Sequence, residues 1–311
     1  MLHYCKQKIL TAIPVLLGIS LLAFMLGVLS PGDPAELALN QSGLNDPSEE
    51  QVAAMRSRLG LDQPIWIRYC VWLFSALQGE LGYSYISGRD IAQEIALRLP
   101  VTLDIALLAL LLAAGGGIVL GLVCATYQGS RLDSCIHTVT SFMLAIPAFW
   151  LALLLVLCFS ETLRLLPTSG SGDFKHLLMP AFVLSFTTLA TICRFMRAAL
   201  LSEFGKQYFL VASVRGLSRL RLLLQYALPN AIVPVVALIG NYLATLLGGA
   251  VIVESIFALP GIGSMALEAI RYRDYPVVQA YVLVSGLTLV LMTILVDLLI
   301  AYINPKVKLE D

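Results

Sequence analysis

The stretch from Leu200 to Pro234, LLSEFGKQYFLVASVRGLSRLRLLLQYALPNAIVP, is a polar and basic island in a chain that is otherwise strongly apolar. Gly216 lies in the middle of it, and glycine gives the backbone the freedom for a turn. The sequence therefore predicts a helix, a glycine-centred turn and a second helix that ends at Pro229. The cations of the island are Lys206, Arg215, Arg219 and Arg221.

The composition is that of an integral membrane protein. The 311 residues are 59% hydrophobic and only 13% charged, with a mean hydropathy of +0.86, whereas a soluble domain is about 25% charged. The net charge of zero argues against nucleic-acid binding. The six cysteines show no CxxC spacing, so neither a disulfide framework nor a metal cage is expected.

Six apolar segments are long enough to span a membrane. The first is too long for a signal-peptide core and lacks a cleavage motif, which favours a retained helix over a signal peptide. Pro147 lies inside the third and is expected to kink it. The segments are residues 9–29, 101–126, 135–158, 177–198, 231–254 and 278–302.

Lys and Arg residues concentrate on short stretches of one side: both chain ends, the connection near residue 131 and the island. Because such residues favour the cytoplasmic side, both termini are predicted to be cytoplasmic. The predicted parts are a first transmembrane helix in 1–30, an extracytoplasmic insertion in 31–99, a five-helix core in 100–305 with its cytoplasmic loop at 200–230, and a cytoplasmic tail in 306–311.

Two helices are expected inside the insertion. SEEQVAAMRSRLGL predicts a capped amphipathic helix that stops at Gly60. PIWIRYCVWLFSALQG carries Trp66, Tyr69, Trp72 and Phe74 at near-helical spacing. This second helix is interpreted as one that lies in the membrane interface or on the bundle, with a substrate entrance as the alternative.

Small residues recur at four-residue spacing in two of the segments, at Gly117 and Gly121 and again at Gly240, Ala244 and Gly248. This pattern indicates close helix packing rather than a pore lining.

Few ionisable residues fall inside or beside the apolar segments, and in a membrane such groups are candidates for function. Asp104, Glu254 and Asp297, together with Pro147, are therefore candidates for a substrate path or gate. The three carboxylates lie near segment ends, so salt bridges or snorkelling are the alternative explanation.

Sequence motifs for an enzyme are absent: the chain has no phosphate-binding GxxxxGK[ST] loop, no HExxH and no GxSxG. From the residues alone, the island has two interpretations, a docking surface for a cytoplasmic partner and a basic loop that rests on anionic lipid.

The island resembles the cytoplasmic loop of the permease subunits of binding-protein-dependent ABC importers, whose signature is E-A-A, three residues, G, nine residues, I-x-L-P. With Gly216 as the anchor, Ala212 matches the third position, and Leu228 and Pro229 match the final pair. The chain departs from the signature at Leu210, Val211 and Tyr226. Leu210 stands where the signature has its acidic residue, and this absence argues against a fixed ion pair to the ATPase.

Other stretches extend the resemblance over nearly the whole chain, among them LGLDQPIWIRY, GELGYSY, RLPVTLDIA, AIPAFWLALLL, VIVESIFALPGIG and RDYPVVQ. They are similar to the B-type permease of the peptide/nickel branch. The resemblance implies an all-α type I ABC importer permease fold with six transmembrane helices and a long extracytoplasmic insertion after the first.

The resemblance also implies partners in a bacterial inner membrane: a second permease, two cytoplasmic ATPases and an external solute-binding protein. ATP and Mg would be used by the ATPases, and this chain would bind no cofactor. The residues implied to form the ATPase-coupling loop are Leu210, Val211, Ala212, Arg215, Gly216, Leu217, Leu228 and Pro229.

The implied substrate is nickel or a small metal chelate, because SEFGKQYFLVAS and LDQPIWIRYCVWLFSAL look closest to nickel-type members. Dipeptides or oligopeptides are the alternative. A secondary transporter or a channel is a more distant alternative, since the sequence shows neither internal repeats nor a pore motif.

Overall fold

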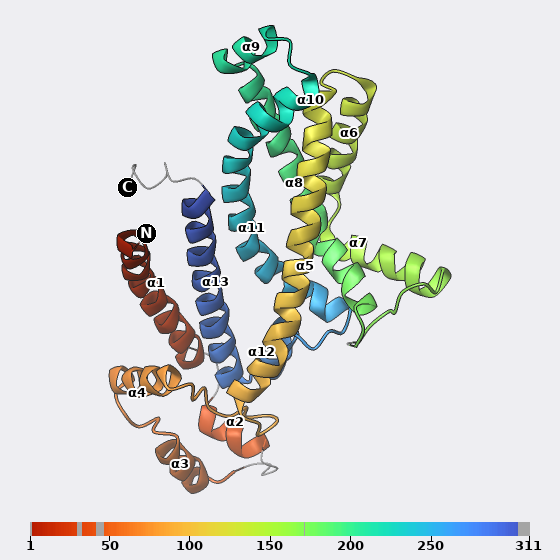
Figure 1. Cartoon of the computed structure of the whole chain (residues 1–311). Helices are drawn as coiled ribbons and strands as arrows, with labels where there is room; N and C mark the ends of the chain where they lie inside the picture. Colours follow the sequence, from red (N-terminus) through yellow and green to blue (C-terminus); the bar gives the residue numbers. More distant parts are fainter. Residues whose placement is uncertain (1, 30–32, 42–46, 171, 304–311) are drawn as a thin grey trace. The chain divides into compact units, whose positions relative to one another are not determined.

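The computed structural model describes residues 2–29, 33–41, 47–170 and 172–303, so the predicted tail at 306–311 lies outside the described residues. The described chain is helical, apart from one isolated bridge between Tyr83 and Asp90, which confirms the all-α prediction (Figure 1). Its elements are α1 (Leu2–Val28), α2 (Pro34–Gln41), α3 (Glu49–Arg58), α4 (Ile65–Leu77), α5 (Ile91–Thr126), α6 (Arg131–Ala145), α7 (Ala148–Leu155), the π-helix η1 (Val156–Thr162), α8 (Lys175–Phe204), α9 (Gln207–Val214), α10 (Arg219–Leu222), the π-helix η2 (Leu223–Ala227), α11 (Leu228–Ile256), α12 (Ile262–Tyr272) and α13 (Tyr275–Ile303).

Five stretches of the described helices are long and apolar enough to cross a membrane, and a bent helix pair brings the number to six. Five of the six predicted segments therefore correspond to helices of spanning length. The five stretches are Leu10–Val28, Ile91–Thr126, Lys175–Phe204, Leu220–Tyr242 and Tyr275–Leu298.

The third predicted segment is not one kinked helix, and this corrects the prediction for residues 135–158. α6 ends at Ala145, and the chain starts again at Ala148 with a bend of 101°. Pro147 stands between the two helices because it lacks the N–H that a continuing helix needs. Ile146, which precedes the proline, is extended with ψ 122°.

Contacts divide the chain into two compact units. The first unit contains Thr102–Leu259 together with residues 2–8 and 291–303, and the second contains Ile9–Val101 and Pro260–Val290 in their described residues.

The core of the first unit forms where α8 packs against α5, α6, α7 and α11. Gly117 and Gly121 of α5 allow its backbone to approach α8 closely. A Cβ atom on Gly121 would lie 2.7 Å from the Cys193 carbonyl oxygen and 2.6 Å from Met196 Cβ. The close packing predicted for this GxxxG pattern is confirmed. Buried members of this core are Ala113, Ala125, Ile192, Met196, Leu200, Leu223, Ala227, Ala231 and Val235.

The second small-residue pattern behaves differently. Gly240 of α11 faces Val296 of α13 in close approach, but a Cβ on Gly248 would meet nothing within 4 Å. The side chain of Ala244 lies outside the described residues. Close packing in α11 is therefore found at Gly240 and not at Gly248.

The predicted helix, glycine turn and helix are present at one end of the first unit, where α9 and α10 lie beyond the ends of α8 and α11 (Figure 1). Gly216 has φ +75°, a left-handed conformation that other residues rarely adopt. The prediction that Pro229 ends the second helix is wrong. The chain stays helical through it because η2 shifts the hydrogen-bond register, and Leu228 N donates to Leu223 O, five residues back.

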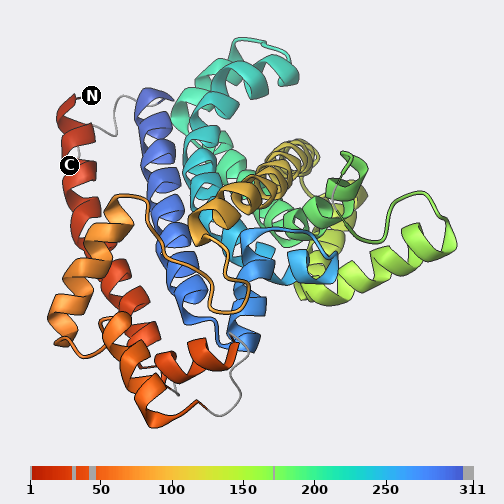
Figure 2. The same cartoon turned by 90° about the horizontal axis from the view of Figure 1, so that it is seen from below.

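In the second unit, α12 and the first turns of α5 and α13 pack together, while α2, α3 and α4 gather near one end of α1 (Figure 2). α3 has the predicted cap: Ser48 accepts from Gln51 N, and Gln51 Oε1 accepts from Ser48 N. None of its residues is fully buried, and its two partly buried residues are the apolar Val52 and Met55. Gly60 follows it with φ +65°.

Candidate functional site

The loop between α8 and α11 exposes several apolar side chains. Val214 is 87% exposed, and Leu210 and Val211 are more than half exposed, although α9 contains only eight residues. Ala212, between them, is buried at 5% and holds α9 onto the first unit. We call the exposed apolar residues of α9 the loop surface: Leu210, Val211 and Val214.

A buried carboxylate fixes α9 in place. Glu203, at the end of α8, is 7% exposed, and its two oxygens accept hydrogen bonds from Lys206 Nζ at 2.6 Å and Tyr208 Oη at 2.5 Å. Burial, with a further contribution from the hydrogen bond to Glu203, raises the pKa of the Tyr208 phenol. The phenol therefore stays protonated and donates at neutral pH.

The same phenol ties α9 to the start of α11. Asn230 Nδ2 donates to Tyr208 Oη at 3.3 Å and to the Tyr226 carbonyl oxygen at 2.9 Å. Glu203, Tyr208 and Asn230 thus connect α8, α9 and α11, and these hydrogen bonds position α9, which carries the loop surface. This network was not predicted, although the sequence carries a signal for it: an acidic residue at the end of an apolar segment, three residues before Lys206.

The beginning of α6 is clamped to α8 by an ion pair. Arg197 Nε and Nη2 donate to Asp133 Oδ1 and Oδ2, both at 2.8 Å, and Asp133 is 5% exposed. Gly129 N adds a third hydrogen bond to Asp133 Oδ2 at 3.0 Å. Such a two-pronged contact fixes direction as well as distance, so α6 and α8 are held in a defined orientation at this end of the unit.

The four residues predicted for a path or gate lie in different surroundings. Glu254 is fully buried and accepts a hydrogen bond of 2.5 Å from Thr102 Oγ1, which joins α11 to α5. Asp297 pairs with Lys8 Nζ at 3.0 Å, as the salt-bridge alternative predicted. Asp104 is exposed, and Pro147 forms the bend between α6 and α7.

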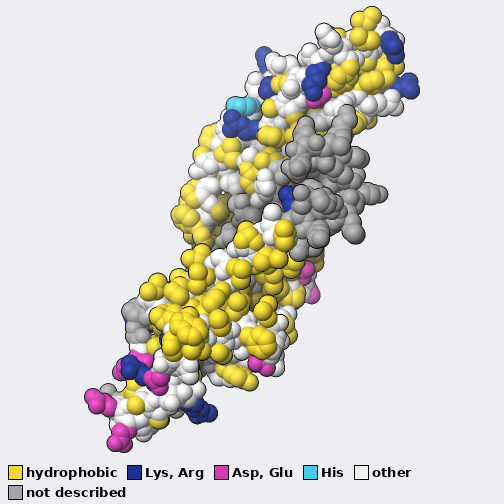
Figure 3. All heavy atoms as spheres, turned by 90° about the vertical axis from the view of Figure 1, so that its left-hand side faces the viewer, with side chains coloured by type: hydrophobic (Ala, Val, Ile, Leu, Met, Phe, Trp, Pro, Cys, Tyr) yellow, Lys and Arg dark blue, Asp and Glu magenta, His cyan; other side chains and the backbone are white. Residues whose placement is uncertain are grey.

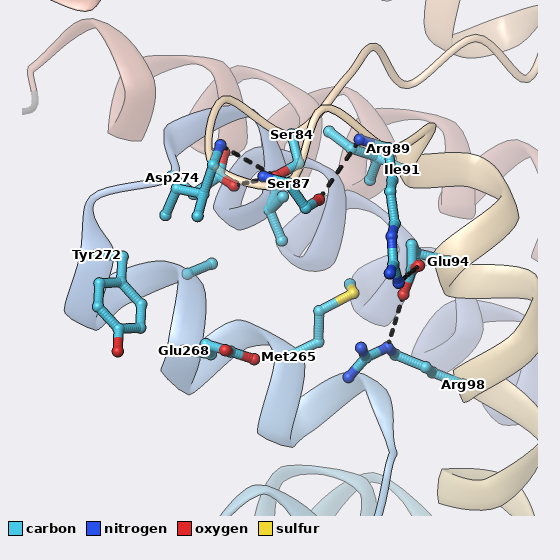
Figure 4. Close-up of a pocket in the computed structure, with 13 residues that line it drawn as sticks. Ser84, Ser87, Arg89, Ile91, Glu94, Arg98, Met265, Glu268, Tyr272 and Asp274 are labelled. Carbon is cyan, nitrogen blue, oxygen red and sulfur yellow. Dashed lines mark hydrogen bonds and ion pairs between the residues drawn. The ribbon is translucent and has the colours of Figure 1, made fainter. Parts of the chain in front are cut away.

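A cavity of about 270 Å³, lined by both charged and apolar side chains, opens in the second unit between α12, the start of α5 and the turn that precedes it (Figure 4). Buried Asp274 accepts from Ser84 Oγ at 2.5 Å and from Tyr85 N at 3.1 Å, which fixes the turn. The Glu94 carboxylate accepts hydrogen bonds from the guanidinium groups of both Arg89 and Arg98. The sequence analysis did not single out any of these residues.

The structure combines apolar spans, closely packed glycine contacts between helices, and a loop whose apolar side chains are exposed. Among the described residues no group of three or more His, Cys, Asp or Glu is placed to hold a metal ion. The spans are typical of a multi-pass membrane component.

Comparison with known proteins identifies the family. The family described as "Binding-protein-dependent transport system inner membrane component" matches residues 117–309, and its N-terminal companion matches residues 1–106. The chain belongs to this family of ABC importer permeases. Members of this kind are multi-pass inner-membrane components and are not themselves enzymes.

Two curated relatives match the chain over almost its whole length. The glutathione transport system permease protein GsiC of Escherichia coli O6:H1 (strain CFT073) is 34% identical over 308 residues, covering 99% of both chains. A putative peptide transport system permease protein of Brucella abortus (strain 2308) is 35% identical over 312 residues, covering 98% of both.

A solved structure shares the fold. The MetNI methionine ABC transporter in inward-facing conformations matches with a TM-score of 0.58 at 16% identity, covering 68% of this chain and 96% of that one. The type I ABC importer permease fold expected from the sequence is therefore confirmed.

Proposed function

We propose that this chain is the permease subunit of an ATP-driven importer of short peptides, a class that includes glutathione. The observation that carries the substrate proposal is the full-length similarity to a glutathione permease and a putative peptide permease, at 34% and 35% identity. This similarity favours the peptide alternative of the sequence analysis over its first choice, nickel.

The loop surface is proposed to dock on a cytoplasmic ATPase. An exposed set of leucine and valine side chains is unfavourable in water and suits a partner's apolar cleft. The hydrogen bonds of Tyr208 to buried Glu203 and to Asn230 give α9 the support that a coupling element needs to transmit motion. In this proposal Leu217, Leu228 and Pro229 support the turn, and Arg215 and Gly216 shape it.

The remaining parts of the proposed assembly are those that the family of the chain implies. A second permease forms the other wall of the path, two ATPases use ATP and Mg, and a solute-binding protein delivers the peptide. The chain itself binds no cofactor. Both termini and the loop surface face the cytoplasm, and the region between α1 and α5 is extracytoplasmic, a topology supported by the distribution of Lys and Arg.

Uptake in a strain that lacks the chromosomal copy tests the substrate. Cells that express this permease with its partner subunits are given radiolabelled glutathione, a radiolabelled dipeptide or radiolabelled nickel. We expect uptake of at least one peptide that disappears when the permease is omitted. Nickel uptake without peptide uptake would contradict the proposal.

Nickel remains the second candidate because two stretches, SEFGKQYFLVAS and LDQPIWIRYCVWLFSAL, look closest to nickel-type permeases. The same experiment separates the two candidates. A nickel importer would take up the ion alone or with a small chelator, and excess unlabelled dipeptide would leave that uptake unchanged.

A further inference from the structure

A groove of about 590 Å³ lies in the second unit where two apolar spans end. Phe24 and Val28 belong to the last turns of α1, and Tyr275 and Gln279 belong to the first turns of α13. Gln279 Nε2 donates to the Phe24 carbonyl oxygen at 3.1 Å, so the two ends adjoin. Ends of membrane spans lie where the hydrocarbon core gives way to lipid headgroups.

Arg68 of α4 lines this groove. It is partly buried, and in the part of the chain that the structure describes it makes no ion pair. A guanidinium that is partly withdrawn from water and has no carboxylate partner favours binding of an anion, and its planar set of N–H donors matches phosphate oxygens.

Tyr85 lines the same groove and supplies a neutral donor. Burial, with a further contribution from the negative charge of Asp274, raises the pKa of its phenol, while nearby Arg68 opposes that change. The hydroxyl therefore remains protonated at neutral pH. Trp72, Phe24 and Ile67 supply apolar and aromatic walls beside the two polar groups.

The surface around the groove is apolar on the outside as well. Tyr69 and Trp72 of α4 pack on Phe24 of α1, with ring centroids 5.4 and 5.8 Å away. Apart from Arg68, the sequence of α4 carries no charge. Figure 3 shows an extended apolar area on this face, with charged side chains gathered below it. Exposed apolar residues of α4 are Ile65, Trp66, Val71, Phe74 and Leu77, and those near the end of α1 are Leu21, Leu22 and Leu26, with Leu29 directly after the helix.

We propose that this groove is a binding site for the headgroup of an anionic phospholipid. Arg68 and Tyr85 bind the phosphodiester, and the acyl chains lie along the exposed apolar sides of α4 and α1. A free phosphate would use the two polar groups only, whereas a phospholipid also covers the exposed leucines and aromatic rings beside them. The site lies apart from the loop surface and involves neither the ATPase nor the imported solute.

Native mass spectrometry of the assembled importer tests the proposal. The complex is first placed in nanodiscs of defined lipid and is then released into a mild detergent, so that only tightly bound lipid stays with it. Discs contain phosphatidylglycerol and phosphatidylcholine in equal amounts. We expect the wild-type complex to retain phosphatidylglycerol in preference, and Arg68→Ala to lower that retention by about tenfold, as the loss of a charge-assisted hydrogen bond predicts.

Arg58→Ala is the matched control because Arg58 is an exposed arginine at the end of α3 in the same unit, outside the groove. It should retain the lipid as the wild type does. Arg68→Lys, which keeps the charge but loses the planar fork, should retain an intermediate amount and so separate loss of binding from loss of fold.

Quenching gives a second readout. In a variant with Trp66 and Trp150 changed to Phe, brominated phosphatidylglycerol should quench the fluorescence of Trp72, and Arg68→Ala should weaken that quenching. Equal retention by Arg68→Ala and the wild type, or equal retention of both lipids by the wild type, would overturn the proposal. Displacement of the lipid by millimolar inorganic phosphate would overturn it in favour of a free-phosphate site.

Discussion

Tyr208 donates a hydrogen bond of 2.5 Å to Glu203, a carboxylate that is 7% exposed at the end of α8. This bond joins the loop helix α9 to a long helix that has the length and composition of a membrane span. A force applied to α9 therefore reaches α8 directly. The same phenol oxygen accepts a hydrogen bond from Asn230 at the start of α11. If the loop surface docks on an ATPase as proposed, this contact is the link that carries its motion to the spans.

Tyr208→Phe removes the phenol oxygen and keeps the ring. We expect the complex to lose about 1 kcal/mol of stability, because one buried acceptor on Glu203 loses its donor. The loop should also become more susceptible to trypsin at Arg215. Thermal unfolding and timed proteolysis of the purified complex measure the two effects. Tyr226→Phe is the control, because only its backbone carbonyl takes part in the network, and it should behave as the wild type.

Arg197→Met leaves the Asp133 carboxylate buried without its cation. Removing one partner of a buried pair destabilises by about 3–5 kcal/mol, whereas replacing both partners with apolar residues is often far less harmful. We therefore expect a large fall in the melting temperature of Arg197→Met and a partial recovery in the double variant with Asp133→Leu. A double variant less stable than Arg197→Met would contradict this explanation.

Gly121→Ala tests the close approach of α5 and α8. The added methyl would lie 2.7 Å from the Cys193 carbonyl oxygen, so the helices must separate, and such overpacking destabilises by about 1–3 kcal/mol. Gly115→Ala on the same helix is the control, since its Cβ would meet nothing within 4 Å. Thermal unfolding should show a lower melting temperature for Gly121→Ala only.

Gly216→Ala tests the turn that orients α9. At φ +75° an alanine is strained by about 1–2 kcal/mol, although its methyl would meet no neighbouring atom within 4 Å. We expect lower peptide uptake per unit of ATP hydrolysed, with normal amounts of permease in the membrane. Gly205→Ala, at φ −81° before the same loop, should leave this ratio unchanged. Equal ratios in the two variants would show that the turn geometry does not matter for coupling.

Much of the fold could be predicted from local signals. Apolar length gave the spans, Gly216 gave the turn in the loop, and Ser48 with Gln51 gave the cap of α3. Each of these depends on residues within a few positions of one another.

The errors have non-local causes. A proline in an apolar run predicts a kink. The size of the bend at Pro147, which is 101°, depends on the helices that pack against α7. Pro229 continues a helix because η2 changes the register before it, and no propensity signals that π-helical turn. The Glu203 network was missed because an acidic residue at a span end is ordinarily wetted by solvent, and its burial depends on Tyr208 folding back from α9.

Co-purification of the ATPases with the permease tests the docking of the loop surface most directly. Val214→Glu places a charge on the residue that is 87% exposed at the end of α9. Ser202→Glu adds the same charge at an exposed position of α8, outside the loop surface. We predict that tagged Val214→Glu permease reaches the membrane but recovers at least about tenfold less ATPase than Ser202→Glu, since burying a charge in an apolar contact is strongly unfavourable. Equal recovery of ATPase by both variants would contradict docking at this surface.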